Sequence, residues 1–459
     1  MLTIDRMTDK LSSSVAVAVL SGLVVLPLAW RLLVASNNGK KSQHGTRKVV
    51  RPSTTKPLLG NTLDVIGNVP IRHDWITSLC LEAKGEPVLL QSLGTPDMTL
   101  LSTPQAFEDV FKNQFDNFPK GPKKAEYLRE LLGEGIFAVD HEKWHHQRKT
   151  ASNLFTMRAL RDSMTTYLLS SSGTNDTVDM FRLLNRFTME AFTEIGFGVH
   201  MNCLDADKEH PFQTAFDPEG QVKKNMDVIN STIFDIVTQT LEHHESCFDP
   251  TYLRDIVVNF IIAGRDTTAQ ALSWFFYCLS KNPQVEAKIR EEVAAKLPKL
   301  FNGQCSPSMD EVGELIYVEA ALRETLRLYP SVPIVSKEAV HDTVLSDGTC
   351  IAAGTLAGLP MYALGRMPHV WGPDAAEFKP ERWIDSGKLI SVSAYQFVAF
   401  NAGPRLCLGK NLAMLEMKLI VASLLSKYHV ELESPENVTY AISFTLPVKG
   451  QLNAKITAV

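Results

Sequence analysis

The segment that decides the fold is FVAFNAGPRLCLGKNLAMLEMK, residues 397–418. It places Cys407 between two glycines, Gly403 and Gly409, and two residues after Arg405. The residues from Gly409 onward are mostly strong helix formers with an apolar stripe, so we expect Cys407 to lie just before a helix N-terminus. A small hydrophobic position in a core would not need such neighbours.

The surroundings of Cys407 suit metal ligation. Unpaired N–H groups and the helix dipole at a helix N-terminus favour a thiolate. Gly403 and Gly409 permit backbone conformations that other residues resist, and they let a flat ligand approach closely. A thiolate held by backbone donors, with Arg405 alongside to meet an anionic group, suits a haem iron and a propionate. A buried structural cysteine is the alternative.

The composition excludes several other classes. The chain has 459 residues, 45% hydrophobic and 21% charged, which predicts a sizeable packed core in one large α-rich domain or in two or three smaller ones. A net charge of −5 gives no reason to expect a nucleic acid partner. Seven scattered cysteines without a CxxC pair favour neither a disulfide framework nor a zinc ribbon.

The first fifty residues carry a second informative segment. Leu11–Trp30 contains no charged residue and is long enough to span a bilayer as a helix. Basic residues follow it, with no acidic residue before Asp64, so residues 1–35 are predicted to be a single-pass anchor with the body on the cytosolic side. A cleaved signal peptide is the alternative. Residues 36–60 are expected to form a basic, proline-containing linker, and residues 61–459 the domain.

Helical patterns dominate the body, beside a small strand-rich lobe. Residues 86–103 predict a hairpin around Gly94–Asp97, and residues 342–359 a second strand region with an Asp347-Gly348 turn. The longest helix candidate covers residues 250–283, with Asp249 as its N-cap, and it is apolar almost all round. Its middle holds AGRDTT, residues 263–268. Polar groups at the centre of a buried helix are costly unless they are paired or used.

Another helix candidate, LIYVEAALRETLRLYP (residues 315–330), brings Glu324 and Arg327 onto one face among apolar residues. The nearby motif FKPERW supplies Arg382 as a third partner. The spacing leaves two interpretations open. One is a surface ion pair of little energetic value, and the other is a buried cluster of one glutamate and two arginines.

The segment FNAGPRLCLG fits the signature Phe-x-x-Gly-x-Arg-x-Cys-x-Gly, so the chain resembles the cytochromes P450, which are haem-thiolate monooxygenases. Other pieces follow in the family's order. WHHQR resembles the C-helix motif, AGRDTT the oxygen-activating groove of the I-helix, ETLR the K-helix motif and PERW its partner. The resemblance runs from about residue 85 to the C-terminus. It implies a mainly α fold with a small β lobe, here carried on an N-terminal transmembrane helix.

The resemblance also implies roles for individual residues. Cys407 would be the axial ligand of the iron of haem b, where it favours O–O cleavage. The propionates would be held by Arg405 together with Trp144 and Arg148, which lie one helical turn apart. The resemblance further includes Phe400, Gly403 and Gly409 in the haem-binding loop.

The I-helix motif would carry the catalytic side chains. Asp266 and Thr267 are expected to deliver protons for oxygen activation, and the small residues Ala263 and Gly264 to leave room for O2. The Thr267 hydroxyl can also bond back to the Ala263 carbonyl, and both descriptions can hold together. By the same resemblance the expected role of the three residues Glu324, Arg327 and Arg382 is structural.

The implied partners are a lipophilic substrate, the endoplasmic reticulum membrane and a separate NADPH–cytochrome P450 reductase, with cytochrome b5 as a further candidate. Lys410, Lys143 and Lys149 are basic candidates for docking the reductase. Within the family, the segments around Trp144 and Thr267, including Arg265, most resemble membrane-bound fatty-acid and alkane hydroxylases. Hydroxylation of fatty acids at or near the chain end is therefore expected, with sterols, terpenoids and xenobiotics left open.

Two features complicate this interpretation. Between residues 204 and 250 the chain is several dozen residues shorter than is usual in this branch, which leaves open a compact variant, an incomplete gene model, or a haem-binding protein with impaired turnover. In addition, HEKWH (His141–His145) matches the zinc metalloprotease motif H-E-x-x-H. The longer metzincin form is absent, because Arg148 stands where the glycine belongs and no histidine stands at the third ligand position.

Overall fold

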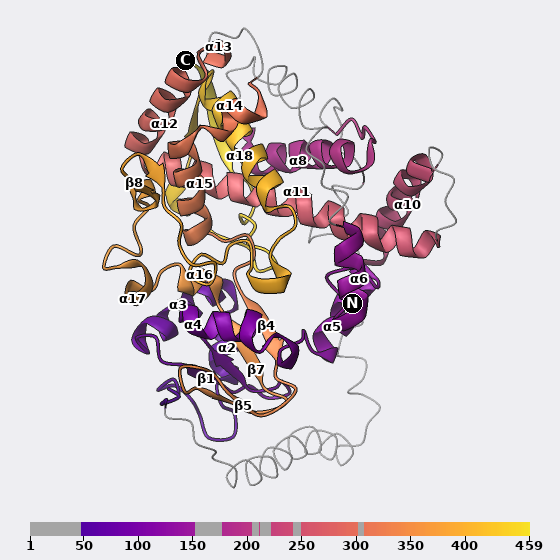
Figure 1. Cartoon of the computed structure of the whole chain (residues 1–459), viewed down its shortest axis with the longest axis vertical. Helices are drawn as coiled ribbons and strands as arrows, with labels where there is room; N and C mark the ends of the chain where they lie inside the picture. Colours follow the sequence, from indigo (N-terminus) through magenta and orange to yellow (C-terminus); the bar gives the residue numbers. More distant parts are fainter. Residues whose placement is uncertain (1–46, 152–176, 204–210, 212–221, 242–248, 302–306) are drawn as a thin grey trace, which may run out of the picture.

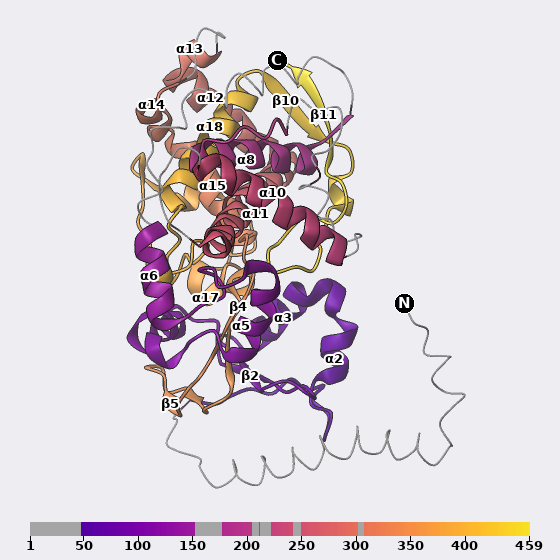
Figure 2. The same ribbon diagram turned by 90° about the vertical axis from the view of Figure 1, so that its right-hand side faces the viewer.

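The computed structural model describes residues 47–151, 177–203, 211, 222–241, 249–301 and 307–459. The predicted anchor, residues 1–35, lies outside these ranges. Within them, no helix combines the length and the apolar character needed to cross a membrane. Figures 1 and 2 show long helices in one part of the molecule and most of the strands, with α2 to α4, in the other.

The helices agree with the sequence prediction of a mainly α body. The longer ones are α3 (Arg72–Glu82), α5 (Pro122–Leu132), α6 (His141–Ala151), α8 (Met180–Phe197), α10 (Val222–Leu241), α11 (Pro250–Ser280), α12 (Pro283–Lys296), α15 (Ile316–Leu328) and α18 (Lys410–Leu425). The short ones are α2 (Thr62–Gly67), α4 (Pro104–Glu108), α13 (Pro298–Phe301), α14 (Met309–Gly313), α16 (Met361–Leu364) and α17 (Pro368–Trp371). A π-helix, η4 (Asp109–Asn113), and the 3-10 turns η3 (Val69–Ile71), η5 (Phe115–Asn117), η6 (Pro380–Trp383), η7 (Gly403–Arg405) and η8 (Pro435–Asn437) complete the set.

The long helix α11 organises the α-rich part and begins as its sequence predicts. Asp249 is the N-cap, since its carboxylate accepts from the N–H of Thr251, and Pro250 occupies the first helical position. Helices α8, α15 and α18 pack around α11 (Figure 1). Their buried side chains, together with those of α12, form the main core, which includes Leu184, Phe275, Ile289, Leu322 and Ile420.

The strands form small sheets, the largest with the order β1-β2-β7-β4. Its strands are β1 (Val88–Leu90), β2 (Met98–Leu100), β4 (Val335–Glu338) and β7 (Leu356–Leu359), and only β2 and β7 run parallel. The predicted hairpins are confirmed, because β1 pairs with β2, and β5 (Thr343–Val344) with β6 (Cys350–Ile351). The other strands pair as β10 (Tyr428–Leu432) with β11 (Asn453–Ala458), β11 with β3 (Thr177–Asp179), and β8 (Ile384–Asp385) with β9 (Lys388–Leu389).

The folded lobe includes residues that the sequence assigned to a linker. Val50 forms a bridge with Val88 beside β1, and the N–H of Val50 donates to the carbonyl of Pro87 over 2.8 Å. Arg47 forms ion pairs with Glu86 and Asp347. The predicted boundary at residue 61 is therefore too late, because backbone and ionic contacts tie residues 47–60 to the lobe.

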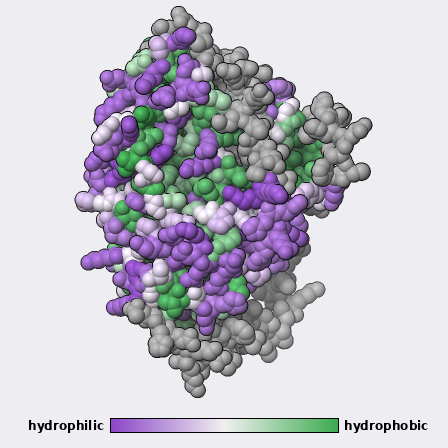
Figure 3. Space-filling view, viewed as in Figure 1, coloured by the Kyte–Doolittle hydropathy of each residue, from purple (hydrophilic) through white to green (hydrophobic). Residues whose placement is uncertain are grey.

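The residues on the surface are of mixed polarity, as expected for a folded body with its core inside. Figure 3 shows hydrophilic side chains over much of one face, with hydrophobic ones visible between them. A group of exposed apolar residues lies near the beginning of the described chain, in and around α2 and η3. It consists of Leu58, Leu59, Leu63, Ile66, Val69 and Ile71, with exposed fractions between 37% and 64%.

Candidate active site

Cys407 lies in the loop between η7 and α18, where backbone groups hold it in place. The N–H of Cys407 donates to the carbonyl of Phe400 over 2.9 Å, and the N–H of Gly409 donates to the thiol. The residue has accessible surface, so a ligand can reach it, although protein surrounds much of the sulfur. This partial burial raises the pKa of the thiol, against the Gly409 N–H, Arg148 and Lys410, which lower it. The groups expected to stabilise the thiolate are therefore present, but burial outweighs their effect on the pKa. A metal cation bound at the sulfur would favour the thiolate over the thiol.

The two glycines of this loop serve different ends. Gly403 has φ of 61°, and a Cβ there would lie 2.2 Å from the carbonyl oxygen of Phe111, so both conformation and space require glycine. Gly409 has φ of −85°, which any residue adopts. The expectation of a special backbone conformation therefore holds for Gly403 and is wrong for Gly409, whose contribution is its N–H.

The three residues expected to bind an anionic group beside Cys407 come together in space. Arg148, from α6, donates to the carbonyl of Leu406 over 2.7 Å, which ties this helix to the Cys407 loop. The guanidinium of Arg405 lies 4.3 Å from the ring centre of Trp144, and that of Arg148 lies 5.7 Å from it. Trp144 itself is buried and so forms a fixed surface between the two cations.

A cluster of buried cations extends this group, and the sequence analysis missed it. Arg405 pairs with Asp140, and Asp140 also accepts from the N–H of Lys120 over 3.0 Å. Burial and the charge of Arg405 lower the pKa of Lys120 to about 6 and that of Lys337 to about 7. Lys124 is close enough for its charge to lower the pKa of Lys337, and burial lowers the pKa of Lys124 as well. Lys120 and Lys124 belong to the short basic segment KGPKK (residues 120–124), but Lys337 lies far along the chain, so no local pattern predicts that the three meet.

The charge balance of this cluster gives a test of the implied cofactor. In the described part of the chain, Asp140 is the carboxylate that neutralises these cations, and the Nε of Arg405 is buried without a hydrogen-bond partner. Buried cations without counterions are costly. A group with two negative charges beside Cys407 would balance them, which is what the two propionates of a haem supply. The residues present therefore fit a haem.

In the middle of α11, Thr267 forms the expected hydrogen bond back to the carbonyl of Ala263. Its hydroxyl donates to the Ala263 carbonyl over 2.6 Å, and the Thr267 carbonyl accepts from the hydroxyl of Ser331 over 2.8 Å. Burial raises the pKa of Asp266, against the opposing effect of Arg265, whose Nε lies 3.4 Å from the carboxylate. A carboxyl group with a raised pKa retains a proton more readily and can donate it.

Gly264 lies where α8 packs against α11. A Cβ at this position would lie 2.0 Å from Cδ2 of Phe192, which belongs to α8. Next to it, the hydroxyl of Thr188 donates to the carbonyl of Arg265 over 3.0 Å. The missing side chain of Gly264 therefore lets α8 pack closely against α11. That Gly264 also leaves room for O2 stays a prediction.

The C-terminal loop around Thr445 and Leu446 is hydrogen-bonded to α11 about one turn beyond Thr267. No sequence motif predicted this contact. The amide of Gln270 donates to the hydroxyl of Thr445 over 2.9 Å and accepts from the N–H of Leu446 over 3.1 Å. The indole of Trp274 donates to the Leu446 carbonyl over 2.7 Å. These bonds fix the position of Phe444, whose side chain is 70% exposed.

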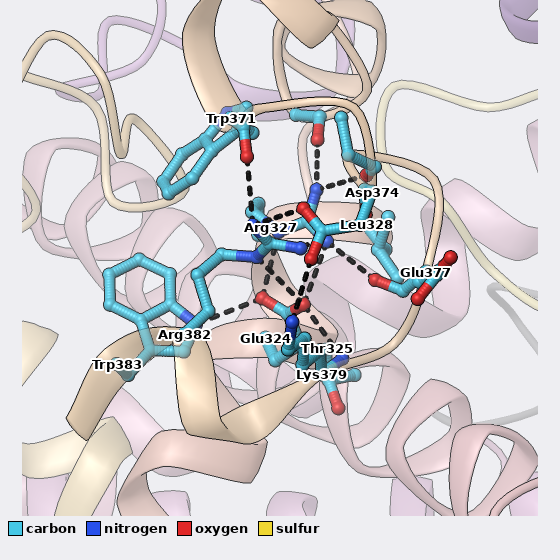
Figure 4. Close-up of polar contacts among 12 residues, drawn as sticks. Glu324, Thr325, Arg327, Leu328, Trp371, Asp374, Glu377, Lys379, Arg382 and Trp383 are labelled. Atoms are coloured by element: carbon cyan, nitrogen blue, oxygen red, sulfur yellow. Dashed lines mark hydrogen bonds and ion pairs between the residues drawn. The ribbon is translucent and has the colours of Figure 1, made fainter.

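The cluster around Glu324 is buried, which decides between the two earlier interpretations (Figure 4). Arg327 donates two hydrogen bonds of 2.8 Å to the Glu324 carboxylate, and Arg382 lies 3.3 Å from it. The indole of Trp383 and the N–H of Lys379 each donate to the same carboxylate over 2.9 Å. Most of the remaining guanidinium bonds go to backbone carbonyls between Trp371, at the end of α17, and Glu377, so the cluster fastens that segment to α15.

The HEKWH motif forms the first part of α6. His145 packs its ring against Trp144, with centroids 4.8 Å apart. Among the residues that the structure describes, no three His, Cys, Asp or Glu side chains are grouped to hold a metal ion.

The fold and this site define a haem-thiolate protein of the cytochrome P450 type. The cytochrome P450 family model matches residues 50–222 and 215–453, and the chain belongs to this family of monooxygenases. The two matched pieces meet inside the segment 204–250.

Plant proteins are among its relatives. Cytochrome P450 86B1 from Arabidopsis thaliana is 34% identical over 84% of this chain and 81% of its own length. Cytochrome P450 94A1 from Vicia sativa is 32% identical, with 82% and 84% covered. Cytochrome P450 704B1 from Arabidopsis thaliana is 31% identical, with 90% and 96% covered.

Proposed function

We propose that this monooxygenase inserts one oxygen atom of O2 into a C–H bond at or near the end of a fatty-acid chain. The observation that carries the haem-dependent part is the reachable thiol of Cys407, held by backbone N–H groups beside a buried cation cluster. The substrate class rests on the likeness of the segments around Trp144 and Thr267 to fatty-acid hydroxylases, and on the relatives named above.

Each residue near Cys407 has a defined part in this proposal. Cys407 would ligate the haem iron through its thiolate, and the N–H of Gly409 holds its sulfur in position. Arg148 and Arg405, which both contact the ring of Trp144, would pair with the propionates. Lys120 and Lys337 would supply further positive charge. Backbone hydrogen bonds of Phe400 and Gly403 shape the loop that holds Cys407. When bound, haem supplies the O2 chemistry with electrons from NADPH through a reductase.

The proton-delivery step uses side chains of α11. Burial raises the pKa of the Asp266 carboxyl group, so this group takes up a proton more readily than a free aspartate. The hydroxyl oxygen of Thr267 can accept a hydrogen bond while its own proton engages Ala263. Neighbouring residues of a helix do not face each other, so transfer of a proton between them would need intervening water. Ala263 keeps the expected role of leaving space on this face of the helix.

The proposal places the protein at the endoplasmic reticulum membrane, with the body on the cytosolic side. It is supported by the uncharged segment Leu11–Trp30 and by the exposed apolar group on α2 and η3, which lies near the beginning of the described chain. Lys143, Lys149 and Lys410 are exposed around the Cys407 loop, where basic residues would attract an acidic reductase surface.

The deciding experiment is a reduced carbon-monoxide difference spectrum of the full chain in membranes, followed by turnover with reductase, NADPH and a panel of fatty acids. We expect the red-shifted Soret band of thiolate-ligated haem, its loss in Cys407→Ser, and products hydroxylated near the chain end. The band without any product would leave a haem-binding protein with impaired turnover. Products from sterols, terpenoids or xenobiotics alone would contradict the fatty-acid assignment.

A further inference from the structure

We propose that four aromatic residues, Trp274, Tyr329, Tyr362 and Tyr440, conduct an electron hole from the oxygen-activating part of α11 to the surface carboxylate of Asp74. The path would remove oxidising equivalents that arise when no substrate is hydroxylated. This inference rests on the proposed haem-dependent function, which supplies the oxidant.

The rings form an unbroken series through the body. Trp274 stacks on Tyr329 with centroids 4.4 Å apart and an interplanar angle of 3°. Tyr329 is 6.3 Å from Tyr362, and Tyr362 is 6.0 Å from Tyr440, both in edge-on geometry. Tyr277 contacts the first two rings, at 5.4 and 5.8 Å. Electron transfer between rings falls off steeply with distance, so rings in contact are favourable steps for a migrating hole.

The inner end of the series lies on the same helix as the candidate catalytic threonine. Trp274 follows Thr267 by two helical turns and therefore lies on the same face of α11. Tyr329 is two residues before Ser331, whose hydroxyl bonds the Thr267 carbonyl. Both inner rings are thus joined to the oxygen-activating segment by short stretches of chain.

The outer end is built to take a proton. The hydroxyls of Tyr362 and Tyr440 donate to the two oxygens of the same carboxylate, Asp74, over 2.9 and 2.8 Å. Asp74 is exposed, so a proton received there can pass to water. Burial raises the pKa of Tyr440 to about 12 and that of Tyr362 further. Neither phenol ionises by itself near neutral pH, and each would lose its proton only when its ring is oxidised.

The positive charge beside Tyr362 favours loss of its electron and its phenol proton together. The guanidinium of Arg366 lies 3.6 Å from the centre of its ring, and a second cation on that ring would be repelled. Transfer of the phenol proton to Asp74 leaves a neutral radical and avoids that repulsion. His73, whose ring lies 5.9 Å from Tyr362 and 5.2 Å from Tyr440, stays neutral because burial lowers its pKa to about 4.

Oxidation of one of these phenols moves one electron and one proton. One electron leaves Tyr362 or Tyr440 and passes through Tyr329 and Trp274 to the haem group oxidised by peroxide, which is thereby reduced by one electron. The phenol O–H bond breaks, and its proton joins the Asp74 carboxylate. A soluble one-electron donor, such as a thiol or ascorbate, then returns an electron to the tyrosyl radical, and the phenol regains its proton from Asp74 or water.

The test treats the substrate-free, haem-loaded full chain with hydrogen peroxide and records the tyrosyl radical by freeze-quench electron paramagnetic resonance, together with the rate of haem bleaching. We expect the double variant Tyr362→Phe/Tyr440→Phe to lower the radical yield several-fold and to accelerate bleaching. Asp74→Asn keeps a hydrogen-bonding group but no base, and we expect it to lower the yield and to remove the solvent deuterium isotope effect on radical formation.

Tyr317→Phe is the matched control. The Tyr317 hydroxyl also donates to a carboxylate, Glu381, over 2.8 Å, but its ring is not part of this series. We expect the control to match the parent. An unchanged radical yield and bleaching rate in the double variant, with thiolate-ligated haem present, would overturn this inference and leave the proposed function standing. Absence of thiolate-ligated haem from the parent chain would overturn both.

Discussion

The hydroxyl of Thr267 donates a hydrogen bond of 2.6 Å to the carbonyl oxygen of Ala263, one helical turn earlier in α11. Because the hydroxyl proton is engaged inside the helix, the oxygen of Thr267 faces its surroundings as an acceptor. Ser331 bonds the carbonyl of the same residue, so the position of Thr267 is fixed from two sides.

From this geometry we expect Thr267→Ala to bind haem normally but to uncouple the reaction. Product formed per NADPH should fall by roughly tenfold or more, within the range of lost acid–base assistance, and peroxide should appear instead. Product, NADPH and peroxide measured in the same samples decide the outcome. Thr267→Ser, which keeps a hydroxyl, should recover most of the coupling. Unchanged product per NADPH in the alanine variant would remove Thr267 from the proton path.

We expect Glu324→Gln to destabilise the protein by about 3–5 kcal/mol, because it leaves the buried guanidinium of Arg327 without its counter-charge. Denaturant unfolding monitored by circular dichroism measures the change. The matched control is Glu108→Gln, which breaks the exposed pair with Lys112 and should cost only about 0.3–0.5 kcal/mol. Equal effects of the two variants would contradict the buried-cluster description.

The pKa values of Lys120 and Lys337 predict that haem binding takes up protons. Without a bound anion these pKa values are about 6 and 7, and the propionates would raise both. Each lysine should therefore lower haem affinity by up to about tenfold per pH unit, from about pH 6 upward for Lys120 and from about pH 7 upward for Lys337. The Cys407 thiol acts in the opposite direction, because it must lose its proton to bind iron. Haem transfer to an acceptor protein at several pH values measures this dependence.

Lys337→Arg provides the control for that titration, because an arginine stays protonated throughout the range. The variant should show a shallower dependence on pH than the parent, with the Lys120 contribution remaining. Identical slopes would show that Lys337 does not change protonation on binding.

Glu416 is buried in α18, and its Oε1 has no hydrogen-bond partner among the described residues. Burial raises its pKa to about 8 in the folded chain, against 4.5 for the free group, so the folded state holds the proton more tightly. Its contribution to stability is therefore lost as pH rises from about 4.5 to 8, by up to about 1.4 kcal/mol per pH unit. Glu416→Gln should be more stable than the parent at about pH 8 and similar at about pH 5, in unfolding curves recorded at both. A difference that does not change with pH would contradict this.

The exposed apolar group on α2 and η3 is expected to contact lipid. A fluorescent label at Ile66→Cys in the membrane-bound full chain should be quenched by brominated lipids. The same label at Tyr127→Cys, a position 77% exposed on α5, should not be quenched. Equal quenching at both positions would reject a specific lipid-facing surface.

Local patterns in the sequence predicted α11 from its cap and proline, the two hairpins from their turns, and the position of Cys407 before a helix. The meeting of Trp144, Arg148 and Arg405 was also predicted, although only through resemblance to a family. These features depend on short stretches of chain, or on motifs whose spacing is known.

What the sequence did not reveal depends on contacts between distant segments. The burial of Lys120 and Lys337 follows from tertiary packing, and no local sequence pattern distinguishes a buried lysine from an exposed one. The packing of Gly264 against Phe192 and the fastening of Leu446 to Gln270 likewise appear only when two elements meet. The extent of the Glu324 cluster also required the structure, because the spacing was equally compatible with a surface pair.

The cation cluster has a consequence for biosynthesis, because its members are separated so widely in the chain. Arg405 follows its ion-pair partner Asp140 by 265 residues. At the usual speed of translation a ribosome needs roughly 15–50 s to add that stretch, so early helices leave the ribosome long before the cluster can close. Haem capture should therefore be a late, post-translational event, and a cell short of haem would accumulate chains whose buried positive charge makes them targets for chaperones and proteases.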